Sequence, residues 1–483
     1  MKGYNLWSYA PYKPLLRDVG DIYICRIAPD KNSVHFEWLD TGNSEYSIYY
    51  RERNADSFIF AGKTMKTQFD IENLETDRDY EIYVESSIGK SLVRLFRTGR
   101  VVGTVVNYLH PDDTVYSFSG RYLGSPSLVR HPDGFLLASM DLFAGNHPSN
   151  LTLIFRSDDN GTTWHYVSEL MPCFWGKMFI HKGELYMLSC STEYGDLLIG
   201  KSTDGGKTFS APVTLLRGSN GKNNNTGIHK NPQNVLVHNG RIYTSLEWGS
   251  YNSAEYCHAA MVMSCSEDDD LLIPENWSFT APKLFETFVP ELACLPKGTV
   301  PIEGTMTISP DGEILNIMRL ASFYLPMSIA NIKDTDDKNL IALSKLLTKG
   351  CAIAYRVDAE NHCAPLSFSH MIPLPTSAKF MIKYDCISKK YYALVSRLAD
   401  KAKLRARNIL ALFSSVDLKE FDLISDVIDF SDADFMTIGF QYVDFEIEDE
   451  DIIFLSRTAM NNAHNYHDVN YSTFHRIKNF RSI

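Results

Sequence analysis

The chain has 483 residues and a formal net charge of −12; 44% of the residues are hydrophobic and 22% are charged. These values are typical of a folded globular protein with two or three modules, and they exclude a disordered or fibrous chain. The acidic balance, without any basic stripe or arginine-rich arm, argues against nucleic acid as a partner.

Residues 1–19 form an N-terminal extension without the continuous apolar segment of a secretory signal, and no run of the chain reaches the roughly 18 apolar residues of a membrane span. The nine cysteines are odd in number and form no CxxC pair, which is typical of a reducing compartment. We therefore expect a cytoplasmic protein without a membrane partner, or a secreted one if a signal has been removed. We expect no cofactor, and the oligomeric state stays open.

Residues 20–98 contain about seven short segments of alternating polarity separated by turn residues, a pattern that predicts a β-sandwich. Phe36 and Trp38 lie one alternation apart on the same face of the second segment. Leu74 precedes Tyr80 by six residues, the spacing of a tyrosine corner. This segment resembles a fibronectin type III domain. The resemblance implies a spacer or docking module rather than a catalytic one.

Residues 101–483 repeat in units of 40–65 residues, and each unit opens with an apolar strand, a tight turn and a second apolar strand. Six such openings occur, near positions 125, 176, 232, 303, 379 and 440, with DG, KG, NG, DG, SK and DED at their turns. They predict an all-β fold in which a six-bladed β-propeller follows the sandwich. Residues 101–118 would supply the strand that completes the last blade and closes the ring.

One motif, Ser-x-Asp-x-Gly-x-Thr-aromatic, occurs twice, as SDDNGTTW at 157–164 and STDGGKTF at 202–209; a worn copy, SSVDLKEF, begins at Ser415. Aspartate accepts hydrogen bonds from turn amides, and glycine adopts backbone angles that other residues resist. The motif resembles the Asp box, or BNR repeat, of sialidase-like six-bladed propellers. In that family it fastens a turn between the third and fourth strands, so we expect Asp159 and Asp204 to be structural.

The sialidase resemblance implies a tyrosine nucleophile activated by a glutamate, an aspartate acid/base and three arginines that clamp a sugar carboxylate. Glu303 stands where the glutamate is expected, and Arg319 stands where one arginine is expected. Gly124 replaces the first arginine, and Phe440 replaces the tyrosine, with Tyr442 two residues on and on the same face by alternation. The fold resemblance therefore does not carry the substrate with it.

Polar residues at the openings of first strands and after second strands are the candidates for a site, because these positions converge on the axis of a propeller. Among them, Asp141 is a candidate general acid, Trp248 could stack on a sugar ring, and His464 and His467 could transfer protons. We expect no metal site. The predicted catalytic residues are Glu303, Asp141, Glu247, His464 and Tyr442, and the predicted substrate-binding residues are Arg319, Arg457, Lys177, His229, Gln233, Trp248, Lys379, Arg397, Gln441 and His467.

Both principal carboxylates also have a structural interpretation. Glu303 could form an ion pair with Arg319 that serves only the fold. Glu247 could be a solvated loop carboxylate.

The functional hypothesis is an exo-acting glycoside hydrolase of sialidase-like fold that removes a terminal acidic or deoxy sugar from an oligosaccharide or glycoconjugate. One alternative is a polysaccharide lyase or histidine-dependent glycosidase on the same propeller. Another is a carbohydrate-binding propeller without catalysis. The sugar, its linkage and the stereochemical course stay open.

Overall fold

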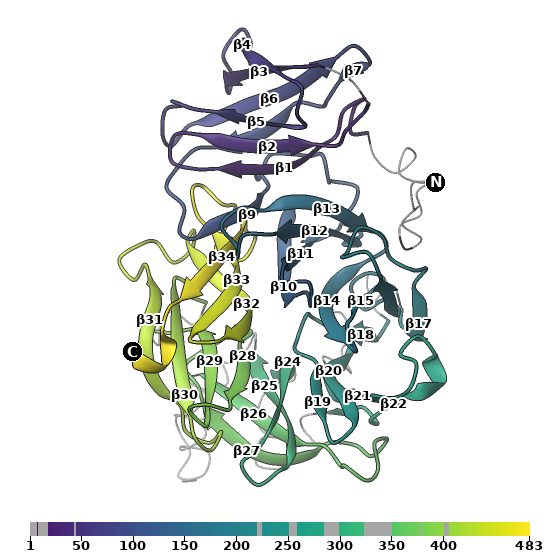
Figure 1. Cartoon of the computed structure of the whole chain (residues 1–483). Helices are drawn as coiled ribbons and strands as arrows, with labels where there is room; N and C mark the ends of the chain where they lie inside the picture. Colours follow the sequence, from purple (N-terminus) through teal and green to yellow (C-terminus); the bar gives the residue numbers. More distant parts are fainter. Residues whose placement is uncertain are drawn as a thin grey trace.

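The computed structural model describes residues 7, 18–42, 45–219, 225–250, 258–284, 299–322, 350–376, 378–399 and 405–483. These residues form strands and two short 3₁₀ turns, Pro274–Asn276 and Phe480–Ser482, and the described ranges contain no α-helix. Nor do they contain any helix with the length and apolar character needed to cross a bilayer. Figure 1 shows a small two-layered module above a ring of six sheets. The predicted all-β class, a sandwich followed by a six-bladed propeller, is confirmed.

The sandwich consists of two antiparallel sheets. The first has the order β1-β2-β5, from β1 (Ile24–Pro29), β2 (Val34–Trp38) and β5 (Gln68–Ile71). The second has the order β4-β3-β6-β7, with β8 also paired to β6, and consists of β3 (Tyr46–Glu52), β4 (Ile59–Thr64), β6 (Asp79–Ser86), β7 (Gly89–Lys90) and β8 (Arg94–Arg97). The sandwich has one strand more than predicted, because the chain forms the two-residue strand β7 directly after β6.

Alternating apolar residues of both sheets form the sandwich core. Phe36 and Trp38 are both buried, as the alternation predicts, with ring centroids 5.7 Å apart. The backbone amide of Glu75 donates a hydrogen bond of 3.0 Å to the hydroxyl of Tyr80. This bond fixes the loop before β6, which is the role expected from the spacing of Leu74 and Tyr80.

Each blade of the ring is an antiparallel sheet whose first strand lies innermost (Figure 1). Blade 1 has β10 (Tyr122–Arg130), β11 (Leu136–Phe143), β12 (Leu151–Ser157) and β13 (His165–Leu170); blade 2 has β14 (Phe174–His181), β15 (Glu184–Cys190), β16 (Leu197–Ser202) and β17 (Val213–Leu216). Blade 3 has β18 (Gly227–His229) and β19 (Leu236–His238), both paired with β20 (Arg241–Gly249), then β21 (His258–Ser266), β22 (Trp277–Phe279) and β23 (Lys283–Leu284).

The remaining blades follow the same order. Blade 4 has β24 (Thr299–Ile308), β25 (Ile314–Ser322), β26 (Cys351–Arg356) and β27 (Ser367–Pro373); blade 5 has β28 (Met381–Asp385), β29 (Lys390–Ser396), β30 (Ile409–Ser415) and β31 (Asp422–Asp429). Blade 6 has β32 (Gly439–Glu448), β33 (Asp451–Ala459), β34 (Tyr471–Ile477) and, as its outer strand, β9 (Thr104–Tyr108). Tyr108 lies opposite Tyr471 in the β9–β34 pair. The predicted closure of the ring by the segment that precedes blade 1 is thus confirmed.

Four innermost strands carry a bulge near their first residues, in β10, β14, β24 and β32. In three of them a bulky residue adopts a positive φ: Trp175 (52°), Glu303 (60°) and Tyr442 (53°). A positive φ costs a non-glycine residue about 1–3 kcal/mol, and a bulge turns a side chain away from simple alternation. The backbone is therefore strained at residues that face the ring axis.

The two repeated octapeptides form turns with the same hydrogen bonds. Ser157 Oγ donates to Asp159 (2.8 Å), and Asp159 also accepts from the amide and hydroxyl of Thr163 (2.8 and 2.7 Å). Asp204 accepts from the same two groups of Thr208 (2.9 and 2.6 Å). Both turns join the third and outermost strands of their blades, so both aspartates hold turns far from the innermost strands.

Replacing Asp159 with alanine is expected to lower the free energy of unfolding by about 1–2 kcal/mol, because three hydrogen bonds to a carboxylate are lost. The matched control is Asp158→Ala. Asp158 is exposed and forms a surface ion pair with Arg156, so its loss should cost roughly 0–1 kcal/mol. Denaturant-induced unfolding of both variants measures the difference, and equal losses would contradict the turn role of Asp159.

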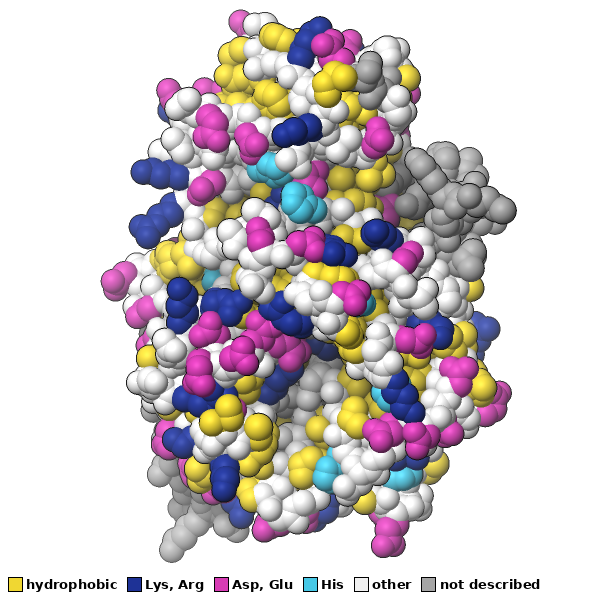
Figure 2. Space-filling model, in the orientation of Figure 1, with side chains coloured by type: hydrophobic (Ala, Val, Ile, Leu, Met, Phe, Trp, Pro, Cys, Tyr) yellow, Lys and Arg dark blue, Asp and Glu magenta, His cyan; other side chains and the backbone are white. Residues whose placement is uncertain are grey.

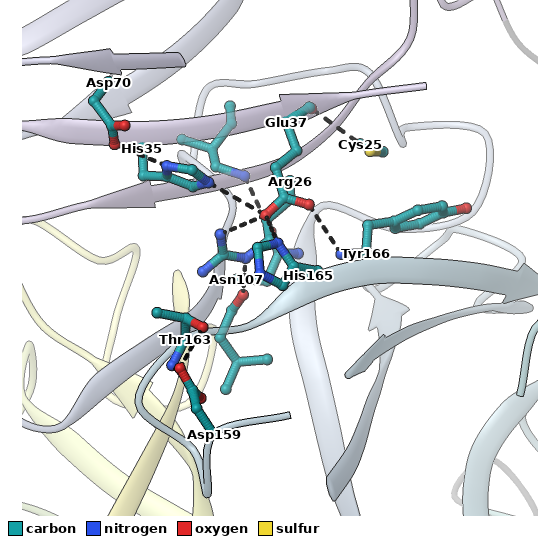
Figure 3. A network of polar contacts seen from close by, with 12 residues as sticks. Cys25, Arg26, His35, Glu37, Asp70, Asn107, Asp159, Thr163, His165 and Tyr166 are labelled. Carbon is teal, nitrogen blue, oxygen red and sulfur yellow. Dashed lines mark hydrogen bonds and ion pairs between the residues drawn. The ribbon is translucent and has the colours of Figure 1, made fainter. Parts of the chain in front are cut away.

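The sandwich is fastened to the ring by a buried network around Glu37 of β2 (Figure 3). Glu37 accepts hydrogen bonds from Arg26 Nη1 (2.9 Å) and from the amide of Tyr166 (3.1 Å), and its carboxylate lies 3.0 Å from His165 Nδ1. Arg26 also donates to the carbonyl of Val106 on β9 (2.8 Å). Because β13 and β9 belong to blades 1 and 6, the network joins the sandwich to the two blades that flank the closure of the ring.

Trp7 is the one described residue of the N-terminal extension before residue 18, and it lies fully buried in the core shared by blades 1 and 2. Its indole nitrogen donates to the carbonyl of Pro172 (2.7 Å), and its ring meets Phe209 edge to face. A Cβ at Gly200 would lie 2.8 Å from the indole, so the absence of a side chain there makes room for Trp7.

Candidate active site

The first strands of the blades, the later parts of the second strands and the segments beside them bring an unusual number of buried charges to the axis of the ring. We call this set the axial cluster: Asp141, Lys177, His229, Lys230, Glu247, Glu303, Arg319, Lys379, Arg407, Asp444 and Arg457, all less than a tenth exposed. Figure 2 shows one face of the ring hollowed at its centre, with basic and acidic side chains gathered beside the hollow. Burying so many charges is costly unless they are paired, so the cluster marks a site rather than a core.

Glu303 is held from three sides. Arg319 Nε donates to the Glu303 carboxylate. The backbone amide of Glu303 donates to the Glu247 carboxylate (2.8 Å), and the side-chain amide of Gln233 donates to the backbone carbonyl of Glu303. Burial alone would raise the pKa of Glu303, but the neighbouring Arg319 guanidinium outweighs this and holds it at about 2. Glu303 is therefore ionised at every pH at which the protein would work.

Three arginines surround Tyr442. Arg319 Nη2 lies 3.5 Å from its hydroxyl, and the guanidinium carbons of Arg457 and Arg407 lie 4.9 and 5.5 Å from its ring centroid. Phe440, which simple alternation places on the same face, is instead buried in the hydrophobic core against Phe430. The bulge in β32 separates the two rings, so Tyr442 alone faces the cations.

Gln441, between these two residues, accepts a hydrogen bond from Arg407 and donates to the carbonyl of Tyr466. It thereby fixes the Arg407 guanidinium beside the tyrosine.

Asp141 explains why Gly124 stands in place of an arginine. A Cβ at Gly124 would lie 2.1 Å from Asp141 Oδ2, so a side chain at 124 and this carboxyl group exclude each other. Neither Asp141 oxygen makes a hydrogen bond of ordinary geometry to another described residue. Burial raises the pKa of Asp141 to about 7, against the opposing effect of Arg457 and Lys379. A carboxyl group that keeps its proton up to neutral pH is suited to general acid catalysis.

His229 and Glu247 form a second acid–base pair. His229 Nδ1 hydrogen-bonds the Glu247 carboxylate. Burial opposes the charged imidazole, but Glu247 outweighs it and raises the pKa of His229. Trp175 and His258 contact the imidazole, with centroids at 4.3 and 4.8 Å. Glu247 is 1% exposed, so its interpretation as a solvated loop carboxylate is wrong.

Arg397 and Trp248 lie outside the axial cluster, although they were predicted to bind substrate. Arg397 forms two hydrogen bonds with Asp426 on the outermost strand of blade 5 (2.7 and 2.5 Å). Trp248 packs against the hydrophobic core of blades 2 and 3. Their predicted substrate contacts have no support in this geometry.

The two predicted histidines of the last loop have different surroundings. His464 is exposed, bonds Asp468 (3.0 Å) and stacks on Tyr122. His467 lies at the edge of the cluster, where Arg457 donates to its carbonyl (2.6 Å), and burial together with Arg457 lowers its pKa to about 4. No group of three metal-ligating side chains occurs in the described part of the chain.

Arg407 and His258 stand at positions of the chain that the sequence reasoning did not consider. Both stand just before or at the start of a third strand, β30 and β21. The search covered the openings of first strands and the ends of second strands, but the start of a third strand reaches the same face of the ring. Extending the search by one position per blade would have found both.

No protein-family model and no curated protein matches the sequence. The structure is similar to a Penicillium chrysogenum alpha-L-arabinanase complexed with arabinobiose (14% identity, 79% of this chain and 99% of that chain, TM-score 0.49). It is also similar to a leech intramolecular trans-sialidase (10%, 99% and 96%, 0.47) and to a polysaccharide lyase of the ulvan lyase type (11%, 93% and 96%, 0.43). At these values the similarity assigns no residue of this chain.

Proposed function

We propose that the chain is a glycoside hydrolase that removes a terminal acidic sugar from an oligosaccharide. The observation that carries the proposal is the arrangement of Arg319, Arg407 and Arg457 around Tyr442. Guanidinium groups bind carboxylates through paired, charge-assisted hydrogen bonds, and a buried set of three favours an anionic sugar over a neutral one.

The acid–base roles follow from the charges at the site. Asp141, protonated up to about neutral pH, donates a proton to the leaving oxygen. Tyr442 attacks the anomeric carbon while its phenolic proton passes to the Glu303 carboxylate, and Arg319, 3.5 Å from the phenolic oxygen, stabilises the negative charge that develops there. Water then attacks the anomeric carbon of the glycosyl–tyrosine intermediate and gives its proton to Asp141, and the phenolic oxygen of Tyr442 takes its proton back from Glu303. Glu303 holds Arg319 in place and balances its charge. The charge of Arg457 acts on Asp141, and its guanidinium lies 4.9 Å from the ring centroid of Tyr442, which supports the pairing of this acid with this nucleophile.

The test is a panel of oligosaccharides that end in sialic acid or a uronic acid, each with a neutral counterpart of the same linkage, together with one that ends in the neutral sugar rhamnose. We expect released sugar only from acidic termini, and loss of turnover in Tyr442→Phe. The control is Tyr384→Phe, because Tyr384 is half exposed on β28 and away from the site. Equal turnover of acidic and neutral termini, or full activity of Tyr442→Phe, refutes the proposal.

The pH dependence follows from Asp141. Its acid form is required, so kcat/KM should be constant at acidic pH and fall about tenfold per pH unit above about 7. Asp141→Asn should lose most activity and also lose this limb of the profile. Rates measured between pH 5 and 9 on both proteins check the expectation, and a wild-type rate that rises through neutral pH contradicts it.

The pair of His229 and Glu247 favours a second candidate, a polysaccharide lyase that acts on uronic acids. In a lyase, the arginines would neutralise the sugar carboxylate, and the buried imidazole of His229 would accept the proton from the carbon that carries this carboxylate. The neutral imidazole is needed, so the rate would rise with pH through the raised pKa of His229, opposite to the hydrolase. A lyase leaves an unsaturated sugar that absorbs in the ultraviolet. A hydrolase adds water across the cleaved bond and leaves only saturated sugars, so absorbance distinguishes the two.

A further inference from the structure

Three lysines of the axial cluster come from blades 2, 3 and 5, and their hydrogen bonds go to residues that have no assigned role in the proposed hydrolysis. Lys177, Lys230 and Lys379, with the side-chain amide of Asn231, define what we call the lysine pocket. We propose that the lysine pocket binds a small oxyanion of the sulfate or phosphate class. This inference does not depend on the proposed function, because it concerns other side chains and has its own readout.

Two of the ammonium groups lie on one short segment of blade 3. Lys230 Nζ donates to the carbonyl of Asn231 (2.9 Å), and Lys379 Nζ donates to the carbonyl of Pro232 (2.8 Å). Both lysines are fully buried. Because these carbonyls belong to consecutive residues, the two positive charges are neighbours.

The third ammonium group is partly compensated. Lys177 pairs with Asp444, whose same oxygen also accepts the amide of Leu128 (2.7 Å). Asn231 Nδ2 is buried and has no hydrogen-bond partner among the described residues. Asp444 is therefore the only carboxylate hydrogen-bonded to the pocket's lysines in the described ranges.

Hydrogen-bond donors outnumber acceptors in the lysine pocket. Each ammonium carries three N–H groups and each has one hydrogen bond to a described residue, while the Asn231 amide adds further donors. Buried donors and charges of this kind are stabilised by a partner that accepts several hydrogen bonds and brings negative charge. A tetrahedral oxyanion satisfies both needs, whereas a cation or a neutral hydroxyl group does not.

Burial is the main cause of the lowered pKa values of two of these lysines. Burial lowers the pKa of Lys230 to about 7 and of Lys379 to about 8, and the neighbouring lysines contribute to both shifts. Cys190 and Glu247 oppose the shift of Lys230. Asp444, Glu303 and Asp141 oppose that of Lys379. A bound anion would raise both pKa values, so binding should take up protons near neutral pH.

The experiment measures the unfolding temperature of the whole chain at pH 7 in increasing sodium sulfate, with ionic strength balanced by sodium chloride. The wild type should rise in a saturable way by roughly 5 °C. Lys230→Met and Lys379→Met should lose the saturable rise. Lys63→Met should keep it, because Lys63 is an exposed lysine on the sandwich, paired with Glu45. An equal rise in all four proteins is a general salt effect and overturns the proposal.

A second measurement needs no variant. Calorimetry of sulfate binding to the wild type should give an affinity at least tenfold weaker at pH 9 than at pH 6, with proton uptake between, because sulfate keeps its charge while the lysines lose theirs. An affinity independent of pH overturns the proposal. A monosaccharide sulfate ester and the unsulfated sugar form a further arm. Tighter binding of the ester than of free sulfate assigns the anion to a substituent of a sugar, and the reverse assigns it to the free ion.

Discussion

Replacing Glu303 with glutamine is expected to lower kcat on an acidic oligosaccharide by about 10³-fold. Glutamine keeps the shape and can still accept a hydrogen bond from Arg319, but it removes the charge that balances the guanidinium. Arg319 is then held less firmly at position 303 and can turn toward another anion, so its contact with the hydroxyl of Tyr442 at 3.5 Å is lost or altered. Initial rates at saturating substrate measure the effect.

The control for Glu303→Gln is Glu313→Gln, in the hairpin turn between β24 and β25, where Glu313 forms an ion pair with Arg356. Its kcat should stay within a factor of two of the wild type. The same variant distinguishes the catalytic interpretation of Glu303 from the purely structural one. If the pair with Arg319 is only structural, Glu303→Gln lowers the unfolding temperature while the folded fraction keeps its normal kcat. That outcome contradicts the catalytic role.

Replacing Glu37 with leucine is expected to lower the free energy of unfolding by about 3–5 kcal/mol, the usual cost of leaving a buried charge without its partner. Arg26, 5% exposed, would lose its carboxylate, and His165 and the amide of Tyr166 would lose their acceptor. Denaturant titration followed by tryptophan fluorescence measures the loss. The double variant Arg26→Met with Glu37→Leu should recover most of it, because the unpaired charge is gone.

The cost of Glu37→Leu should depend on pH. Burial opposes ionisation of Glu37, but His165, His35 and Arg26 lower its pKa below 4.5, so its contribution is present above that value and is lost in acid. The hydrogen bond to Glu37 raises the pKa of His165 above 6.5, so that contribution is present below 6.5 and is lost as pH rises past the raised value. The largest loss is expected near pH 5.5. An equal loss at pH 5.5 and 9 would show that His165 contributes nothing.

Most of the fold could be predicted because its signals are local. The turn residues DG, KG, NG, DG, SK and DED separate six pairs of apolar strands, and their repetition indicates six blades. The divided first strand of blade 3 could not be predicted in this way. Its two parts, β18 and β19, flank Pro232, which lacks an amide hydrogen and cannot continue a ladder.

The site was harder to predict because it depends on bulges and on contacts between distant segments. Alternation assigns a residue to a face only while the register is regular, and the bulge in β32 separates Phe440 from Tyr442. The departure at Gly124 looked like the loss of a functional residue. In the folded chain, the absence of a side chain at Gly124 leaves the space that the Asp141 carboxyl group fills. The repeat of the blades does not predict this contact.

The closure of the ring has a consequence for how the protein is made. The strand that completes blade 6, β9, is synthesised before any blade, while its partner β34 lies roughly 360 residues further along. At about 5–20 residues per second, β9 waits for roughly 20–70 s with one edge unpaired while the ribosome finishes the chain. The sandwich is complete by then, and Arg26 can already hold the carbonyls of β9. The N-terminal module can therefore hold the closing strand of the ring in position before its partner strand has been synthesised.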